Sequence, residues 1–134
     1  MRARLMLVLA LGALTIHCDD DRTGATEGLT FFEHPDFEGN SITLAGGFSD
    51  FDDLRGPCNR TTNPVTGATG DGDWDNCISS VMVSPGWEGT ASEHDDYQGE
   101  TLAITQNITD LDDVRGPCGD DWDDCISSLQ VSRR

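Results

Sequence analysis

The chain has 134 residues, with 25 acidic and 8 basic side chains that give a formal net charge of −17. This length fits one domain, and the excess of carboxylates disfavours nucleic acid or an anionic membrane as a partner, because both are bound through Lys and Arg. The charge instead favours cations. With 15 Gly and 5 Pro in a chain that is 36% apolar, the composition predicts a turn-rich all-β protein.

The N-terminus has the pattern of an export signal. Arg2 and Arg4 precede an unbroken apolar run over residues 5–14. The run is shorter than the roughly 20 apolar residues that a membrane span requires. We therefore expect residues 1–17 to be a signal peptide, and its removal takes away Arg2 and Arg4 and changes the net charge from −17 to −19.

Cys18 follows directly, at the position where bacterial lipoproteins are cleaved and acylated. His17 stands where such sites usually have a small residue, so ordinary cleavage nearby, leaving Cys18 as a free thiol, is the alternative. We favour lipidation of Cys18 because it also accounts for the odd one of the five cysteines. Residues 18–28 then form an acidic tether, and the protein is expected in a bacterial cell envelope, in the periplasm or on the outer surface, or otherwise secreted.

The remainder of the chain is a duplication. Residues 32–39 match 92–99, residues 50–58 match 110–118, and residues 74–80 match 122–128. Fifteen residues separate Cys58 from Trp74 but only three separate Cys118 from Trp122, so the first copy carries 12 extra residues within 59–73. Two copies indicate a duplicated supersecondary unit, since a solenoid needs more repeats. The insert is rich in Thr, Gly and Asn, which predicts a surface loop.

Within each copy the hydrophobic period is two, as expected of half-buried strands. Strands are predicted at the following residues: 29–33, 42–44, 81–83, 90–93, 102–104 and 129–131. Gln130 stands at the position equivalent to Met82, and this polar residue indicates that its face of the strand is exposed to solvent. Residues 50–55 and 110–115 could each form one helical turn, with Asp at its start to suit the helix dipole. Two units of about four short strands predict a two-sheet sandwich over residues 29–132, with motif one at 29–84 and motif two at 86–132.

Two paired sequence elements suggest a family. The pattern Glu-His-x-x-(Phe/Tyr)-x-Gly occurs at residues 33–39 and 93–99, and (Asn/Asp)-(Asn/Asp)-x-x-Ser-Ser occurs at 75–80 and 123–128. Together they resemble the βγ-crystallin Greek-key motif in its calcium-binding form, over nearly all of residues 29–132. The resemblance implies one all-β sandwich domain built from two Greek-key motifs. The 12-residue insert and the Arg-Gly-Pro-Cys segments depart from the family pattern.

The same resemblance implies two Ca²⁺ sites that exchange ligands between the motifs. Ca²⁺ takes six to eight oxygen ligands from carboxylates, carbonyls, hydroxyls and water. One site would use the Glu33 and Cys77 carbonyls, the Ser79 hydroxyl and the Asp124 carboxylate. The other would use the Glu93 and Cys125 carbonyls, the Ser127 hydroxyl and the Asn76 amide oxygen. The second site should be weaker because Asn76 is neutral. The alternative is that both elements only shape loops, since Asx and Ser side chains readily hydrogen-bond the backbone.

Four cysteines remain after Cys18, and they permit three disulfide connectivities. Each copy contains two of them, so a pairing local to each copy would be inherited by duplication. We therefore predict the disulfides Cys58–Cys77 and Cys118–Cys125. These cysteines lack the clustered spacing of a zinc site.

Other candidates are weaker. His34 and His94 are expected to pack in their hairpins, and Trp74 and Trp122 in the core or as lids. The Asp-rich runs at 50–53, 110–113 and 120–124 are expected to be solvated loops that add negative potential near the cation sites. No constellation in the sequence supports an enzyme.

The leading hypothesis is thus an exported, non-enzymatic, monomeric calcium-binding module, with no membrane contact except a lipid on Cys18 and no protein partner indicated by the sequence. The competing hypothesis is a secreted inhibitor of metallopeptidases with a βγ-crystallin-like fold. In that case the insert at residues 59–73 would be the reactive loop.

Overall fold

The computed structural model describes residues 25–134. The predicted signal peptide, Cys18 with its predicted lipid, and most of the acidic tether lie outside the described residues. Within the described part, no helix has the length and apolar character needed to cross a membrane.

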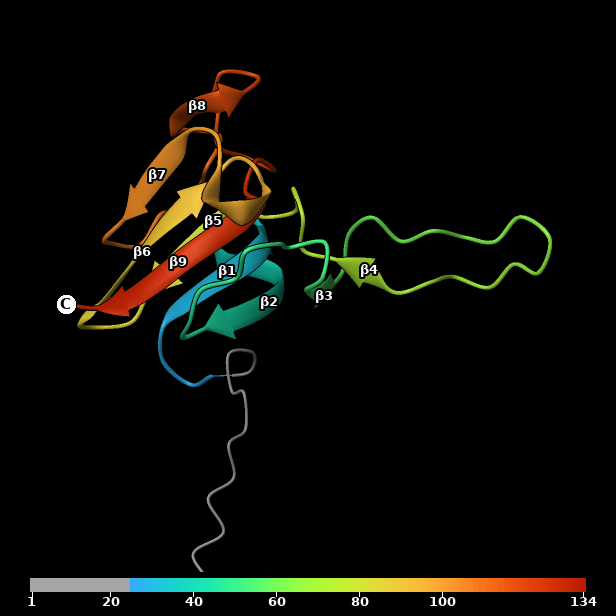
Figure 1. The fold of residues 1–134 in the computed structure, drawn as a ribbon, viewed down its shortest axis with the longest axis horizontal. Helices are drawn as coiled ribbons and strands as arrows, with labels where there is room; N and C mark the ends of the chain where they lie inside the picture. Colours follow the sequence, from blue (N-terminus) through green and yellow to red (C-terminus); the bar gives the residue numbers. More distant parts are fainter. Residues whose placement is uncertain (1–24) are drawn as a thin grey trace, which may run out of the picture.

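Strands are the main regular secondary structure of the described residues (Figure 1). They are β1 (Leu29–His34), β2 (Glu38–Leu44), β3 (Arg55–Gly56), β4 (Gly72–Asp73), β5 (Ser80–Val83), β6 (Trp87–Ser92), β7 (Thr101–Ile104), β8 (Arg115–Cys118) and β9 (Ser128–Arg133), with two short 3₁₀ turns, η1 (Pro35–Phe37) and η2 (Asp95–Tyr97). There are two three-stranded sheets, ordered β2-β1-β5 and β7-β6-β9, and a separate two-stranded ribbon of β3 and β4. The predicted all-β sandwich is confirmed.

Each repeat builds one sheet in the same register. Phe31 in β1 lies opposite Ile42 and Val81, and its equivalent Ala91 in β6 lies opposite Leu102 and Leu129. All the pairings are antiparallel. The faces alternate as the sequence predicted, because buried Val81 and Leu129 are followed by exposed residues at 82 and 130.

The two repeats exchange backbone pairing. Phe48, from the first repeat, pairs with Leu129 in β9, and both N–H···O distances are 2.8 Å. Ile108, from the second repeat, pairs with Val81 in β5, and both distances are 2.9 Å. Each sheet is therefore extended by a segment of the other repeat, which is the crossed connection of a Greek key.

The core lies between the two sheets and contains residues of both repeats. Trp74 and Trp122 are each 3% exposed, so the prediction that they are core residues is confirmed. Phe31 and Phe51 meet edge to face with ring centroids 6.3 Å apart. The second repeat has Ala91 and Leu111 at these two positions. The first repeat thus supplies more of the bulk that fills the core.

The segments expected to form one helical turn are shorter than that. The Leu54 N–H donates to the Phe51 carbonyl at 3.1 Å, and the Val114 N–H donates to the Leu111 carbonyl at 3.1 Å, so each segment is a single reverse turn. The Asp at the start of each caps it, as the Asp50 carboxylate does by accepting the Asp52 N–H at 2.9 Å. The turn ends because the chain passes into the short strands β3 and β8.

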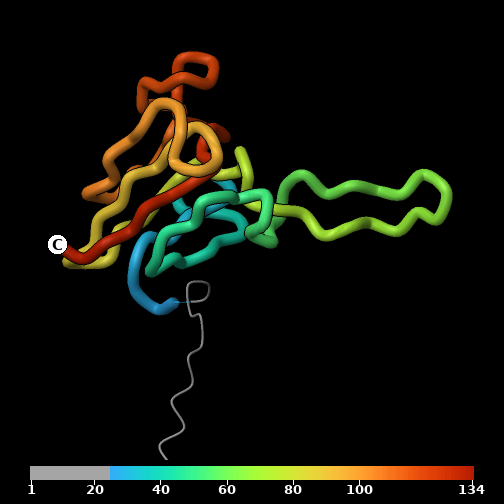
Figure 2. The backbone as a smooth tube through the Cα atoms, viewed as in Figure 1, coloured from blue at the N-terminus to red at the C-terminus, as the bar shows by residue number. Residues whose placement is uncertain are grey.

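Both predicted disulfides are present. Cys58 pairs with Cys77, with Cα atoms 5.9 Å apart, and Cys118 pairs with Cys125, with Cα atoms 5.7 Å apart. The first bond closes the base of the insert. Residues 59–71, which we call the arm, are all exposed and project away from both sheets (Figures 1 and 2). The predicted surface loop is therefore confirmed.

Because Phe31 is fully buried against Phe51, Phe31→Ala should lower the free energy of unfolding by about 3–5 kcal/mol, measured by urea denaturation. Met82→Ala is the control, since Met82 lies on the outer face of the same sheet and is 38% exposed. Equal losses in the two variants would show that Phe31 does not anchor the core.

Candidate metal centre

The first half of each candidate site is a folded hairpin. After β1, Asp36 and Phe37 take left-handed φ values of 57° and 63°, and Gly39 follows at 82°. A Cβ atom at Gly39 would lie 2.8 Å from Cδ2 of His34, so only glycine fits there. His34 therefore packs against the hairpin, as predicted. Residues 94–99 repeat the same conformation in the second repeat.

The last serine of each motif locks this hairpin. The Ser80 hydroxyl donates to the His34 carbonyl at 2.6 Å and accepts the Phe37 N–H at 3.1 Å. Ser128 makes the equivalent bonds in the second repeat, at 2.6 and 3.1 Å. Both serines are fully buried. Sequence analysis did not assign them this role, although the repeated Ser-Ser pair was the signal that could have indicated it.

The preceding serine lies beside the first strand of its own repeat. The Ser79 N–H donates to the carbonyl of Phe32, the residue before Glu33, at 3.0 Å. The Ser127 N–H makes the same 3.0 Å bond to Ser92, the residue before Glu93. The structure therefore places Ser79 beside the strand that leads to Glu33, and Ser127 beside the strand that leads to Glu93.

The fourth predicted ligand of each site comes from the other repeat. The Asp124 N–H donates to the Ile78 carbonyl at 3.1 Å, and the Asn76 N–H donates to the Ile126 carbonyl at 3.2 Å. Asn76 and Asp124 have φ values of 48° and 49°, in the left-handed region that Asn and Asp tolerate. Each turn thus crosses the other, and each Asx residue lies beside the Cys-Ile-Ser segment of the opposite repeat.

In the second predicted site, which consists of Glu93, Cys125, Ser127 and Asn76, the side-chain geometry agrees with an exchange of ligands between the repeats. The Ser127 hydroxyl lies 3.5 Å from Oδ1 of Asn76. The Asn76 amide nitrogen donates instead to Oδ2 of Asp75 at 2.7 Å. The oxygen of Asn76 is therefore turned toward Ser127, as a shared cation would require.

The electrostatics of Asp124 concern the first predicted site, which consists of Glu33, Cys77, Ser79 and Asp124. Loss of water around the Asp124 carboxyl group, together with the charge on Asp123, raises the pKa of Asp124 to about 6. The charge on Glu33 raises this pKa further, and His34 opposes the shift. Asp124 therefore lies within electrostatic range of the Glu33 hairpin of the other repeat.

Two buried carboxylate oxygens flank these turns. Oδ1 of Asp75 and Oδ1 of Asp123 have no hydrogen-bond partner within residues 25–134. A buried polar atom without a partner is unfavourable, and a hydrated cation would satisfy it. The available donors are oxygens, because the four nearby cysteines are in disulfides, and this donor chemistry fits Ca²⁺ rather than Zn²⁺.

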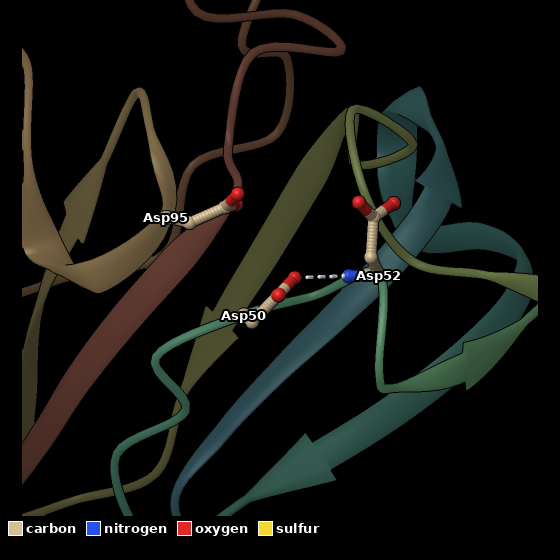
Figure 3. Close-up of side chains that lie close together, drawn as sticks. All are labelled: Asp50, Asp52 and Asp95. Carbon is tan, nitrogen blue, oxygen red and sulfur yellow. Dashed lines mark hydrogen bonds between the residues drawn. The ribbon is translucent and has the colours of Figure 1, made fainter.

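Further carboxylates lie beside the second predicted site. Oxygen atoms of Asp50, Asp52 and Asp95 lie within 4.8 Å of one another. Figure 3 shows these three side chains. The charge on Asp75 is the main cause of a raised pKa at Asp52, while desolvation and then the charge on Asp50 raise the pKa of Asp95. Sequence analysis predicted that residues 50–53 add negative potential near a site, but it missed Asp95.

Among residues 25–134, this cluster of carboxylates occurs in one half only. The Asp96 N–H donates to the Ser49 carbonyl at 2.7 Å and so brings η2 against the turn at residues 50–53. The equivalent bond in the other half runs from Asp36 to Thr109, also at 2.7 Å. There the position of Asp95 is taken by Pro35, which has no carboxylate.

Comparison with solved structures agrees with this architecture. A βγ-crystallin domain from Flavobacterium johnsoniae matches with a TM-score of 0.54 and 19% identity, covering 79% of this chain and 94% of that chain. A βγ-crystallin from Ciona intestinalis matches with a TM-score of 0.54 and 19% identity, covering 78% of this chain and 99% of that one. The chain has the βγ-crystallin fold.

The N-terminal domain of protein S is a further example of this fold, with a TM-score of 0.51, 24% identity, and coverage of 79% of this chain and 96% of that domain. No protein-family model and no curated protein matches the chain. The likeness to βγ-crystallins is therefore one of fold, and the function has to be argued from the site.

The raised pKa of Asp124 predicts a pH-dependent cost of folding without calcium. An ionised carboxyl whose folded pKa is about 6, against roughly 3.9 unfolded, destabilises the fold above pH 6, and this penalty disappears as pH falls below 4. In EDTA, Asp124→Asn should therefore raise stability at pH 7.5 by about 1 kcal/mol or less, since the group is partly screened by solvent. Thermal melts from pH 4 to 8 measure this.

Asp113→Asn is the control for this experiment, because Asp113 is exposed and its removal reports only the general relief of negative charge. The Asp124→Asn and parent curves should converge near pH 4. A gain at pH 7.5 no larger than that of Asp113→Asn would contradict the proposed desolvation of Asp124.

Proposed function

We propose that this protein is an exported, non-enzymatic calcium-binding module whose fold is stabilised by calcium. The observation that carries the proposal is the crossing of the two turns. Asn76 lies beside Ser127, and the Asp124 N–H bonds to the Ile78 carbonyl. In the proposed arrangement, oxygen donors of both repeats would therefore converge at two places. The unpaired oxygens of Asp75 and Asp123 beside these turns support the same conclusion.

Calcium would act on the fold in two ways. It would neutralise carboxylates that repel one another, since the pKa values of Asp52, Asp95, Asp112 and Asp124 are all raised at least in part by neighbouring Asp charges. It would also join the repeats, because each ion would take ligands from both. A ligand that binds only the folded state stabilises it by about 2.7 kcal/mol at a hundredfold excess over Kd.

Export and anchoring form part of the same proposal. The two disulfides suit an oxidising compartment, where such bonds form and persist. The apolar run before Cys18 is the signal for export, and Cys18 is the residue on which a lipid would hold the domain at the cell envelope. The domain itself would then face the medium, where calcium is accessible.

The thermal stability of the protein should rise when calcium is added. Melts in EDTA and in millimolar calcium are compared. At a hundredfold excess over Kd, the gain of about 2.7 kcal/mol should raise the midpoint by about 10–20 °C, at about 4–8 °C for each kcal/mol in a domain of this size. Magnesium is the control, because it prefers a smaller octahedral shell and retains its water. Coincident curves in EDTA and calcium would contradict the proposal.

The two sites should be separable by substitution. Asp124→Gly and Ser79→Ala should abolish the tighter site in calorimetric titration, and Asn76→Gly and Ser127→Ala the weaker one. Glycine is used at positions 76 and 124 because it retains the left-handed φ while removing the ligand. Ser132→Ala, at the end of β9, is the control.

The pairing of effects tests the exchange of ligands between repeats. If Ser79→Ala abolished the same site as Asn76→Gly, each site would be built within one repeat. Calcium binding would then survive as a proposal, but the reciprocal arrangement would be wrong.

A further inference from the structure

The arm differs from the rest of the acidic surface in composition. Residues 61–70 include no charged side chain, although the whole chain has a net charge of −17. They are small or β-branched, and the largest apolar side chain among them, Val65, is 90% exposed at the tip. The tip is ordered only by its own turn, in which the Asn63 carboxamide oxygen accepts the N–H groups of Val65 and Thr66 at 2.8 and 3.1 Å.

The other long connections are bonded to the sheets. The segment between β2 and β3 is held by the reciprocal pairing of Phe48 with Leu129. The segment between β7 and β8 is held by Ile108, which pairs with Val81, and by Asn107, which accepts the Val83 N–H at 2.7 Å. Opening either connection would therefore break pairing in a sheet.

The arm has no such support among the described residues. The main-chain bonds of residues 61–70 join the arm only to itself, as between Asn63 and Ala68 and between Thr61 and Gly70. Its root is fixed, because the Asn59 side chain donates to Asp73 and to the Asp75 carbonyl at 2.7 and 2.9 Å. The arm can therefore open beyond residue 60 while the sandwich stays intact, which is the behaviour of a low-stability local unit.

We infer that the arm is a site of limited proteolysis, cut after Val65 by an endopeptidase that prefers small aliphatic side chains. Exposed tips with small residues are the preferred sites of such cleavage. Water adds across the Val65–Thr66 peptide bond, so that the Val65 carbonyl carbon gains the oxygen of a carboxylate and the Thr66 nitrogen becomes an ammonium group. Nothing is oxidised or reduced.

The product is a two-chain protein that keeps its fold. The Cys58–Cys77 disulfide spans the cut and joins the two fragments covalently. Their strands are also interleaved, since β1 and β2 precede the cut while β5, which pairs with β1, follows it. Cleavage therefore adds two charged termini at the tip without dividing either sheet.

The lack of main-chain bonds between residues 61–70 and the sheets also distinguishes a substrate of an endopeptidase from an inhibitor of one. A loop that blocks an endopeptidase gains its affinity from being held in the bound conformation before binding. Residues 61–70 of the arm make no main-chain hydrogen bond to the sandwich that could hold them in this way. The structure thus favours cleavage of the arm over the peptidase-inhibitor hypothesis, and it does so independently of calcium binding.

The test is digestion of the purified protein with a catalytic amount of elastase, which cuts after small aliphatic residues. We expect one early cut after Val65, a mass gain of one water, one band without reductant and two fragments with it. The cut protein should retain a cooperative melt.

Two variants should stay uncut over the time in which the parent is fully converted. The first combines Val65→Asp with Ala68→Asp, which leaves the arm in place but places charges at its aliphatic positions. The second replaces residues 59–73 with the three residues 119–121 of the second repeat, which close the equivalent loop.

Three results would overturn the inference. One is a first cut outside residues 61–70, which would show that another segment opens more readily. Another is an intact protein that inhibits elastase, which would restore the inhibitor hypothesis. The last is loss of the cooperative melt after the cut under non-reducing conditions, which would show that the arm is part of the folded unit.

Discussion

Main-chain hydrogen bonds that cross between the two repeats are the constraint on which the structure depends. Phe48 pairs with Leu129, Ile108 pairs with Val81, and the turns at Asn76 and Asp124 bond to the opposite repeat. A buried backbone group left without a partner is costly, so neither sheet is complete without a segment of the other repeat. Because of this exchange, the two repeats share one core, and each candidate site lies next to a turn of the opposite repeat.

Local patterns in the sequence were sufficient for the six strands of the two three-stranded sheets, but not for the short strands β3, β4 and β8 or for long-range partners. Period-two alternation predicted the strands, and duplication predicted the local disulfides, because both depend on residues near one another in the chain. The contact of Ser80 with His34 spans 46 residues, and that of Ser127 with Asn76 spans 51. No local period encodes such contacts, and only the family resemblance placed Asn76 and Asp124 at opposite sites.

The repeats have kept their backbone and diverged in side chains. Both repeats have the same left-handed residues after their first strand, and the buried Ser80 and Ser128 make the same bonds to these hairpins. The crossed turns are also the same. The differences lie where the backbone does not depend on the side chain, as in Phe31 against Ala91 or Asn76 against Asp124. Loop length is free as well, since extending a loop closed at its base adds only about 0.6 kcal/mol of closure entropy per doubling.

The exchange of segments also has a consequence for the origin of the fold. A single repeat, as a separate chain, would leave the backbone around its Phe48 or Ile108 equivalent without a sheet to join. Two identical copies could satisfy one another across a twofold axis, because each main-chain bond that crosses between the repeats has an equivalent in the reverse direction. A symmetric homodimer of half-length chains is therefore a structurally complete ancestor. Fusion of its genes would have removed the dependence on concentration and allowed the two halves to become different.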